Sequence, residues 1–177
     1  PPDLLIPVWI AHEVAHAIRY TSPESASDLR RLVTEEGGYY DFWVTGSRAT
    51  LRELLLNEGL AVHSAQAVGP GLDPADYFGY PKRQYNRLRE MESFLTRMMA
   101  PELDLSGLGL RLRYLTGGMS PSARLVGGRV IPERSGYYIG YRMAEALVEQ
   151  RGIAAALRAS PAEFEAADHS AKGVQTA

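Results

Sequence analysis

No cysteine occurs among the 177 residues of the sequence, so disulfide bonds and zinc sites built on thiolates are excluded. Any transition-metal site must therefore use histidine and carboxylate ligands. The chain also lacks an uninterrupted apolar run long enough for a membrane-spanning helix. Its formal net charge of −2 provides no general attraction for nucleic acid or for an anionic membrane surface.

The sequence does contain enough apolar material for one core, because 45% of its residues are hydrophobic and 23% are charged. We expect residues 1–177 to form a single domain, with residues 166–177 as a flexible tail. Because the chain starts at Pro1 without a methionine, we expect this domain to be part of a longer precursor. The composition fits a cytoplasmic domain as well as one that is secreted or anchored, and it leaves the oligomeric state open.

Histidine is scarce, yet two of the 4 histidines are four residues apart, at His12 and His16, with Glu13 between them. On an α-helix these two imidazoles share one face and can direct nitrogens at a zinc ion about 2.0–2.1 Å from each. Glu13 lies about 100° round the helix from His12, where it can bond a water held by the metal without binding the metal itself. The motif predicts a zinc site with Glu13 as general base.

The residues around this motif are apolar. From Val8 to Ile18 the motif's histidines and glutamate are the only polar residues. A helix that is apolar all round is usually buried, and a buried carboxylate needs a cation or a dense hydrogen-bond network. We therefore expect the helix to be buried and its polar residues to share a metal ion.

The third ligand is expected on a second helix, and Glu58 is the candidate. It falls inside an apolar stripe with the spacing of a core-facing helix. The stripe consists of Leu51, Leu54, Leu55, Ala61, Val62 and Ala65. Glu53 lies about 140° away, on the side that we expect to be polar, with Asn57 and Ser64. Gly59 should cost about 1 kcal/mol inside a helix, so we expect the two metal-binding helices to approach closely there.

These motifs resemble those of the gluzincin metallopeptidases, in which two histidines of one helix and a glutamate of a later helix bind zinc. The string Asn57-Glu58-Gly59-Leu60-Ala61 is especially similar to that of neutral zinc aminopeptidases. Those enzymes have a much shorter link than the 41 residues that separate His16 from Glu58 here. The aspartate that thermolysin-like enzymes place four residues after the ligand glutamate is replaced by Val62. No partner for the ligand histidines is therefore assigned.

A closer resemblance is to a bacterial family of predicted zinc-dependent proteases. That family combines the histidine motif, a Glu-Gly-x-Ala string and a late Gly-Tyr-x-x-Gly-Tyr segment, here residues 136–141, so that the resemblance spans His12 to Gly152. It implies that Tyr137 donates a hydrogen bond to the oxyanion of the tetrahedral intermediate, with Tyr141 as second choice. The alternative is that both tyrosines are ordinary residues of an amphipathic helix. Losing one oxyanion donor typically costs about 10²–10³ in turnover.

The pattern of residues predicts a mainly helical, zincin-like domain with little β structure. A short helix is expected to begin at Ser22 or Ser25 and to continue through Glu36. Longer helices are expected over residues 50–69, 82–99 and 135–152, and a small hairpin with a Gly-Gly turn is expected within 124–131. Two further histidines lie outside the motif. His63 is about 140° round the second helix from Glu58, where a hydrogen-bonded or solvated structural role is expected, and His169 falls in the tail.

The sequence thus predicts a zinc metallopeptidase, a hydrolase with one zinc per chain on His12, His16 and Glu58, acting on a peptide or protein. It leaves open whether the enzyme cleaves internal bonds or releases N-terminal residues. An alternative is a zinc-stabilised but catalytically inactive binding or regulatory module on the same fold. A third reading, a metal-free helical protein with both histidines buried, is the least expected.

Overall fold

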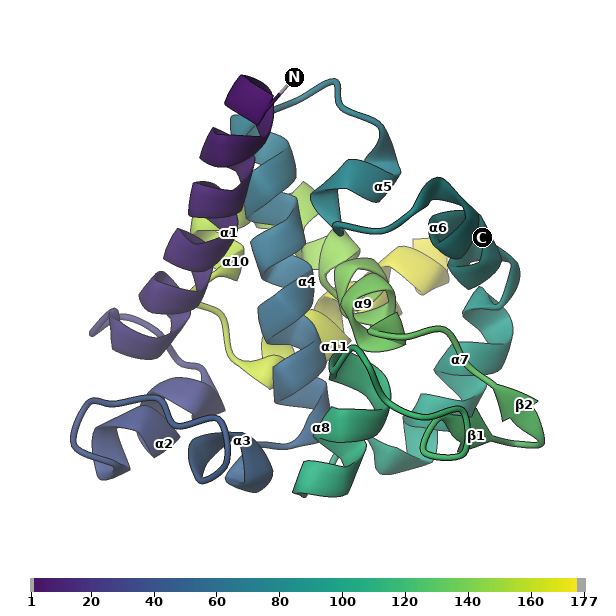
Figure 1. Ribbon diagram of the computed structural model, residues 1–177. Helices are drawn as coiled ribbons and strands as arrows, with labels where there is room; N and C mark the ends of the chain where they lie inside the picture. The colour runs from purple at the N-terminus through teal and green to yellow at the C-terminus, as the bar shows by residue number, and fades with distance from the viewer. Residues whose placement is uncertain (1, 175–177) are drawn as a thin grey trace.

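The computed structural model describes residues 2–174 and is mainly helical (Figure 1). Its helices are α1 (Pro2–Thr21), α2 (Asp28–Glu35), α3 (Thr45–Arg48), α4 (Leu51–Val68), α5 (Pro74–Tyr77), α6 (Lys82–Glu90), α7 (Glu92–Met99), the 3₁₀ turn η1 (Ala100–Glu102), α8 (Leu108–Leu115), α9 (Ser135–Arg151), α10 (Ile153–Ala156) and α11 (Pro161–Val174). Strands β1 (Leu125–Val126) and β2 (Arg129–Val130) form the expected antiparallel hairpin. The prediction of a mainly helical domain with a small hairpin is confirmed.

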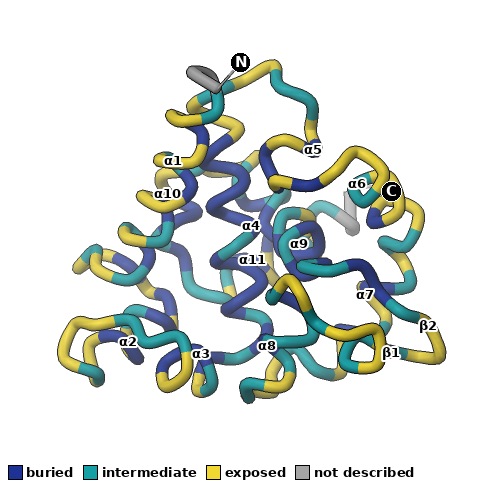
Figure 2. The backbone as a smooth tube through the Cα atoms, in the orientation of Figure 1, coloured by how far each residue is buried: buried dark blue, intermediate teal, exposed yellow. Residues whose placement is uncertain are grey.

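Helix α4 is the centre of the core, with α1 on one side and α9 on the other (Figure 1). Thr50 caps its start by accepting a hydrogen bond from the backbone N–H of Glu53, and Gly69 ends it. Figure 2 shows α4 buried along most of its length. The expected polar side is wrong, since Glu53, Asn57 and Ser64 are all buried. Their polarity does not mark a solvent face because neighbouring helices surround α4.

Two glycines set the contact between α4 and α9. A Cβ added to Gly140 would lie 1.8 Å from the carbonyl oxygen of Leu55, and one added to Gly59 would lie 2.1 Å from the carbonyl carbon of Gly140. The helices therefore touch backbone to backbone. The sequence correctly marks Gly59 as a site of close approach, but the partner is α9 and not α1, the other helix that was expected to bind the metal. Gly140 is the residue of α9 that allows this close packing.

A buried ion pair ties α1 to α4. Arg19 and Glu53 are both 0% exposed, and their closest atoms, Nη2 and Oε1, are 2.6 Å apart. The guanidinium also donates to the carbonyl oxygens of Leu157 and Ala159, while the Ser27 hydroxyl donates to the same carboxylate oxygen. These bonds satisfy much of the hydrogen-bonding capacity of the pair, which a buried charge requires. They hold α1, the start of α2, α4 and the segment after α10 together.

The C-terminal half of the chain contains more helix than the sequence predicts. Residues 166–174, expected to be part of a flexible tail, belong to α11, where Ala167 is buried, and residues 175–177 lie outside the described part of the chain. The helix expected over residues 82–99 is divided at Met91, whose N–H bonds the carbonyls of both Arg87 and Leu88. None of the helices in the described part combines the length and apolarity needed to cross a bilayer.

Candidate metal centre

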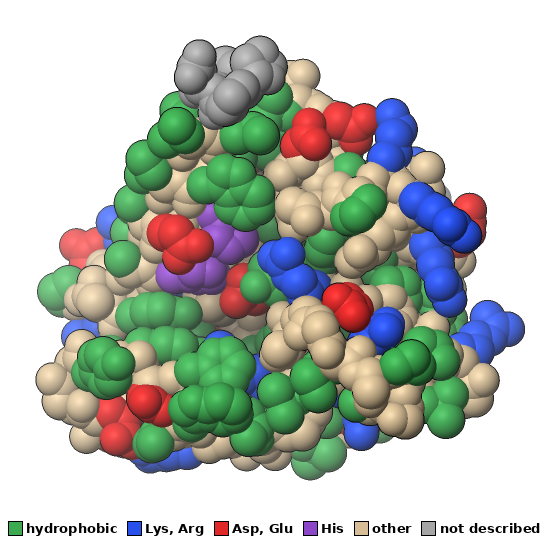
Figure 3. Space-filling view, viewed as in Figure 1, with side chains coloured by type: hydrophobic (Ala, Val, Ile, Leu, Met, Phe, Trp, Pro, Cys, Tyr) green, Lys and Arg blue, Asp and Glu red, His purple; other side chains and the backbone are tan. Residues whose placement is uncertain are grey.

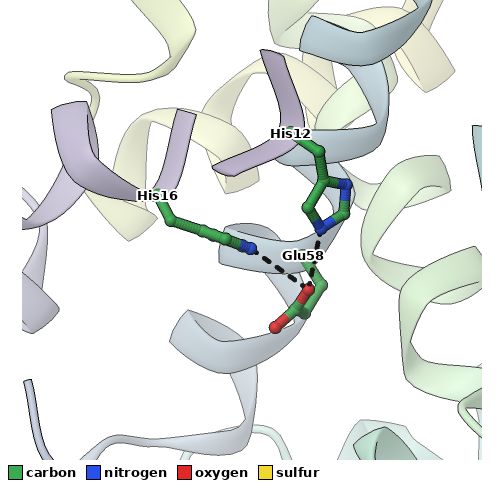
Figure 4. Close-up of side chains that lie close together, drawn as sticks. All are labelled: His12, His16 and Glu58. Carbon is green, nitrogen blue, oxygen red and sulfur yellow. Dashed lines mark ion pairs between the residues drawn. The ribbon is translucent and has the colours of Figure 1, made fainter. Parts of the chain in front are cut away.

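The two motif histidines and Glu58 meet where α1 packs on α4 (Figure 4). His12 and His16 are one turn apart on the face of α1 that contacts α4, and Glu58 points back at them from α4. Atom Oε2 of Glu58 lies 3.6 Å from Nε2 of His12 and 3.5 Å from Nε2 of His16. One atom from each residue lies within 4.8 Å of the others. These three residues are called the ligand triad below.

The ligand triad fits a zinc ion in both distance and chemistry. Two ligand atoms about 2.0–2.1 Å from a tetrahedral zinc are about 3.4 Å apart, close to the separations of the Glu58 oxygen from the two imidazole nitrogens. That oxygen is buried and has no hydrogen-bond partner. A buried carboxylate oxygen without a donor is costly, and a cation removes the cost. The triad could therefore hold a metal ion.

The electrostatics of the triad also favour a bound metal ion. Burial opposes ionisation of Glu58, but the two imidazoles outweigh it and hold the pKa of this carboxyl far below its usual range. Burial also disfavours the protonated form of His16, yet the carboxylates of Glu58 and, more weakly, Glu13 raise its pKa. Glu58 is thus held in its ionised form, and its carboxylate favours a positive charge between the two imidazoles.

The expectation that α1 is buried all round is wrong. Its outer face is apolar but open to solvent, with Ile6 57%, Trp9 38%, Ile10 58% and Val14 49% exposed. Figure 3 shows hydrophobic side chains along this edge of the molecule, with histidine atoms visible in a hollow beside them. Glu13 is also exposed, and its charge acts on His16. Helix α1 packs mainly against α4 and α2, and in the described part of the chain its opposite face is largely open to solvent.

The structure brings Tyr137 to the triad and directs Tyr141 elsewhere. The Tyr137 ring stacks on that of His12, with centroids 6.3 Å apart and an angle of 13° between the planes. Burial and the charge of Glu58 raise the pKa of Tyr137 above its ordinary value. The Tyr141 hydroxyl instead donates to Gln66, 3.1 Å away, and its ring stacks on His63.

The His16 ring packs against a second stack of aromatic rings, which the sequence pattern did not predict. The Tyr20 ring is nearly parallel to that of His16 at a centroid distance of 5.9 Å, and Tyr40 stacks on Tyr20 at 4.8 Å. Asn57 donates a hydrogen bond of 2.9 Å to the Tyr20 hydroxyl. Tyr20 lies four residues after His16, so helical spacing was a usable signal for it. The sequence contains no comparable signal for Tyr40, which comes from the loop before α3.

Two histidines on one helix and a glutamate on another form a ligand set that catalytic zinc sites use. Residues 40–166 match the model of a family described as "Predicted Zn-dependent protease (DUF2268)", and the chain belongs to this family. The matched region includes Glu58 and Tyr137, whereas the histidine motif precedes it. No curated protein and no solved structure matches the chain.

Proposed function

We propose that this protein is a zinc-dependent metallopeptidase with one zinc ion per chain, held by His12, His16 and Glu58. The convergence of these three side chains from α1 and α4 is the observation that supports it most directly. Membership of a family of predicted zinc-dependent proteases is the second support. A site of only three protein ligands leaves a tetrahedral position for water or substrate, as catalytic zinc sites do.

When bound there, zinc would lower the pKa of a water molecule towards about 7 and polarise the scissile carbonyl. Glu13 is the group that accepts the water's proton and passes it to the leaving amine, since it lies one residue after His12, its charge acts on His16, and it is open to solvent. Tyr137 would donate its phenolic hydrogen to the oxyanion. A raised pKa keeps this phenol protonated, and therefore able to donate, at neutral pH.

The first experiment compares zinc content and peptide cleavage in three variants. Glu58→Ala removes a ligand, so we expect zinc, measured by atomic emission, to be lost or greatly weakened. Glu13→Gln leaves the triad intact, so we expect about one zinc per chain with cleavage of a peptide library reduced by about 10²–10⁴. Glu90→Gln, on the exposed side of α6, is the matched control and should retain both.

Each outcome separates the candidate functions. Equal zinc content in Glu58→Ala and wild-type protein would contradict the assignment of Glu58 as a ligand. Stoichiometric zinc without any cleavage by the wild-type protein would favour an inactive, zinc-stabilised binding module. Cleavage that survives in Glu13→Gln would remove Glu13 from the role of general base.

A further inference from the structure

Arg134 has an unusual backbone conformation directly before the helix that carries Tyr137. Its φ of 52° and ψ of 27° place it in the left-handed region, and no other residue besides glycine has positive φ in the described part of the chain. This conformation disfavours a long side chain by about 1 kcal/mol or more. The Tyr80 hydroxyl stabilises it by donating to the Arg134 carbonyl at 2.6 Å. Strain of this kind is most often retained where it positions a functional side chain.

The side chain of Arg134 is directed towards the metal centre. Its guanidinium carbon lies 4.2 Å from the centre of the Tyr137 ring and 5.6 Å from that of Tyr80. Because Tyr137 in turn stacks on His12, the cation, the phenol and the ligand imidazole form one continuous group. Consistent with this, burial and the charge of Glu58 raise the pKa of the Tyr137 phenol, whereas Arg134 lowers it through its charge and a hydrogen bond. Figure 3 shows basic side chains on the surface immediately beside the histidines.

The guanidinium has no carboxylate partner within the described residues. The adjacent acid, Glu133, is instead 3.6 Å from Arg124 and accepts a hydrogen bond from the N–H of Gly118. Contact with aromatic rings occupies the faces of a guanidinium and leaves the donors along its edge available. One donor of the Arg134 guanidinium reaches the Tyr137 hydroxyl. A half-buried arginine without a carboxylate partner is best satisfied by a carboxylate, whose two oxygens match two parallel N–H groups.

We propose that Arg134 binds a carboxylate of the peptide substrate and so determines substrate selectivity. The inference rests on the proposed peptidase function, because it concerns the same cleft. The carboxylate is either the C-terminus of the substrate or the side chain of an aspartate or glutamate near the cleaved bond. In the first case the enzyme removes residues from C-termini or cleaves short peptides, and in the second it cleaves beside acidic residues.

The test uses three peptides with the same apolar core. The first contains glutamine and ends in an amide, the second contains glutamine and ends in a free carboxylate, and the third contains glutamate and ends in an amide. The ratio of kcat/KM for each acidic peptide to that for the neutral one is the measured quantity. We expect wild-type protein to prefer the second or the third peptide, which identifies the source of the carboxylate.

In Arg134→Asn this ratio should fall about 10- to 100-fold, the loss typical of a charge-assisted hydrogen-bonding pair. Asparagine tolerates the left-handed conformation, so the variant retains the backbone. Arg134→Lys keeps the charge but not the paired donors, and its ratio should be intermediate. Arg129→Asn is the matched control, because Arg129 also stacks on a ring, that of Phe94, at 5.1 Å but lies on the hairpin. An unchanged ratio in Arg134→Asn, whether or not overall activity falls, would overturn the proposal.

A binding measurement separates this inference from the proposed function. Zinc-loaded Glu13→Gln protein, with and without Arg134→Asn, is titrated with the three peptides by calorimetry. Preferential binding of an acidic peptide that depends on Arg134 supports carboxylate recognition even if no peptide is cleaved. Equal affinity for all three peptides overturns it, even if the wild-type protein proves to be an active peptidase.

Discussion

His63 shows how a single residue of α4 can be polar without belonging to the metal site. Its side chain is 8% exposed, and Nε2 donates a hydrogen bond of 3.0 Å to the carbonyl of Tyr141 in the middle of α9. The imidazole also stacks on the Tyr141 ring, with centroids 4.0 Å apart. This agrees with the hydrogen-bonded structural role expected from its angle to Glu58.

The burial of His63 predicts a specific dependence of stability on pH. Burial lowers the pKa of His63 to about 4, whereas the unfolded chain retains the ordinary value of about 6.5. Between these values the unfolded state binds more protons, so stability is full above about pH 6.5 and declines as the pH falls towards 4. The loss should be on the order of 3 kcal/mol.

The measurement is urea unfolding of zinc-free protein between pH 4 and 7, for wild type and His63→Gln. The glutamine retains a donor for the Tyr141 carbonyl but does not titrate. We expect the wild-type free energy of unfolding to decline more steeply than that of the variant. Parallel curves would show that His63 is not the group responsible.

At the residue scale, the sequence is informative where chemistry and local spacing coincide. His12, Glu13 and His16 can be assigned from one helical turn, and Glu58 from an apolar stripe that contains a single acid. Arg134, and Tyr40 in the ring stack beside His16, could not be assigned in this way. Their contacts join residues far apart in the chain, and the sequence contains no rule for which ring will face which.

At the scale of elements, the contact between α4 and α9 is the most demanding of the fold. We predict that Gly140→Ala lowers the free energy of unfolding by about 3 kcal/mol or more, because its Cβ would overlap the Leu55 carbonyl and the backbones would have to separate. Gly109→Ala is the control, since a Cβ at this position of α8 meets no atom within 4 Å. It should instead raise stability by about 0.5–1 kcal/mol, as alanine is the better helix former.

Chemical denaturation of both variants provides the test, with zinc affinity as a second readout. Glu58 is adjacent to Gly59, which lies in this contact. Displacement of α4 in the Gly140→Ala variant should therefore also weaken metal binding. Equal stabilities for the two alanine variants would mean that the helices have room to separate without cost.

Helices and turns whose ends are marked by capping or turn residues could be predicted from the sequence. Elements that depend on contacts with distant parts of the chain could not. Thr50, Gly127-Gly128 and Gly152 mark the start of α4, the hairpin turn and the end of α9 in the sequence, and all three appear in the structure. Helix α8 was not predicted, because glycines surround it and its support comes from the burial of Tyr114 and Leu115. The solvent exposure of the apolar face of α1 could not be inferred either, since periodicity does not reveal whether another element covers a face.

For the molecule as a whole, the Arg19–Glu53 pair is the central polar connection. We predict that Glu53→Gln destabilises the protein by about 3–5 kcal/mol, because it leaves the buried guanidinium without a counter-charge. The double variant Arg19→Met/Glu53→Met should be more stable than the summed effects of the single variants Arg19→Met and Glu53→Met imply, since it removes both charges together. The free energies of unfolding of the single and double variants measure this coupling.

Arg31→Gln is the control for this cycle, because the Arg31–Glu35 pair is largely exposed. It should change stability little, as exposed ion pairs usually contribute little. Additive effects in the double variant would argue against a direct energetic link between the two buried charges.

The order of the helices along the chain also has a consequence for biosynthesis. All three proposed ligands belong to α1 and α4, whereas the backbone that packs against Gly59 belongs to α9, much later in the chain. Chains are synthesised from the N-terminus, so the complete ligand set leaves the ribosome before α9 exists. A zinc ion captured at that stage would join α1 to α4 ahead of the rest of the core, and metal supply would then influence how efficiently the protein matures.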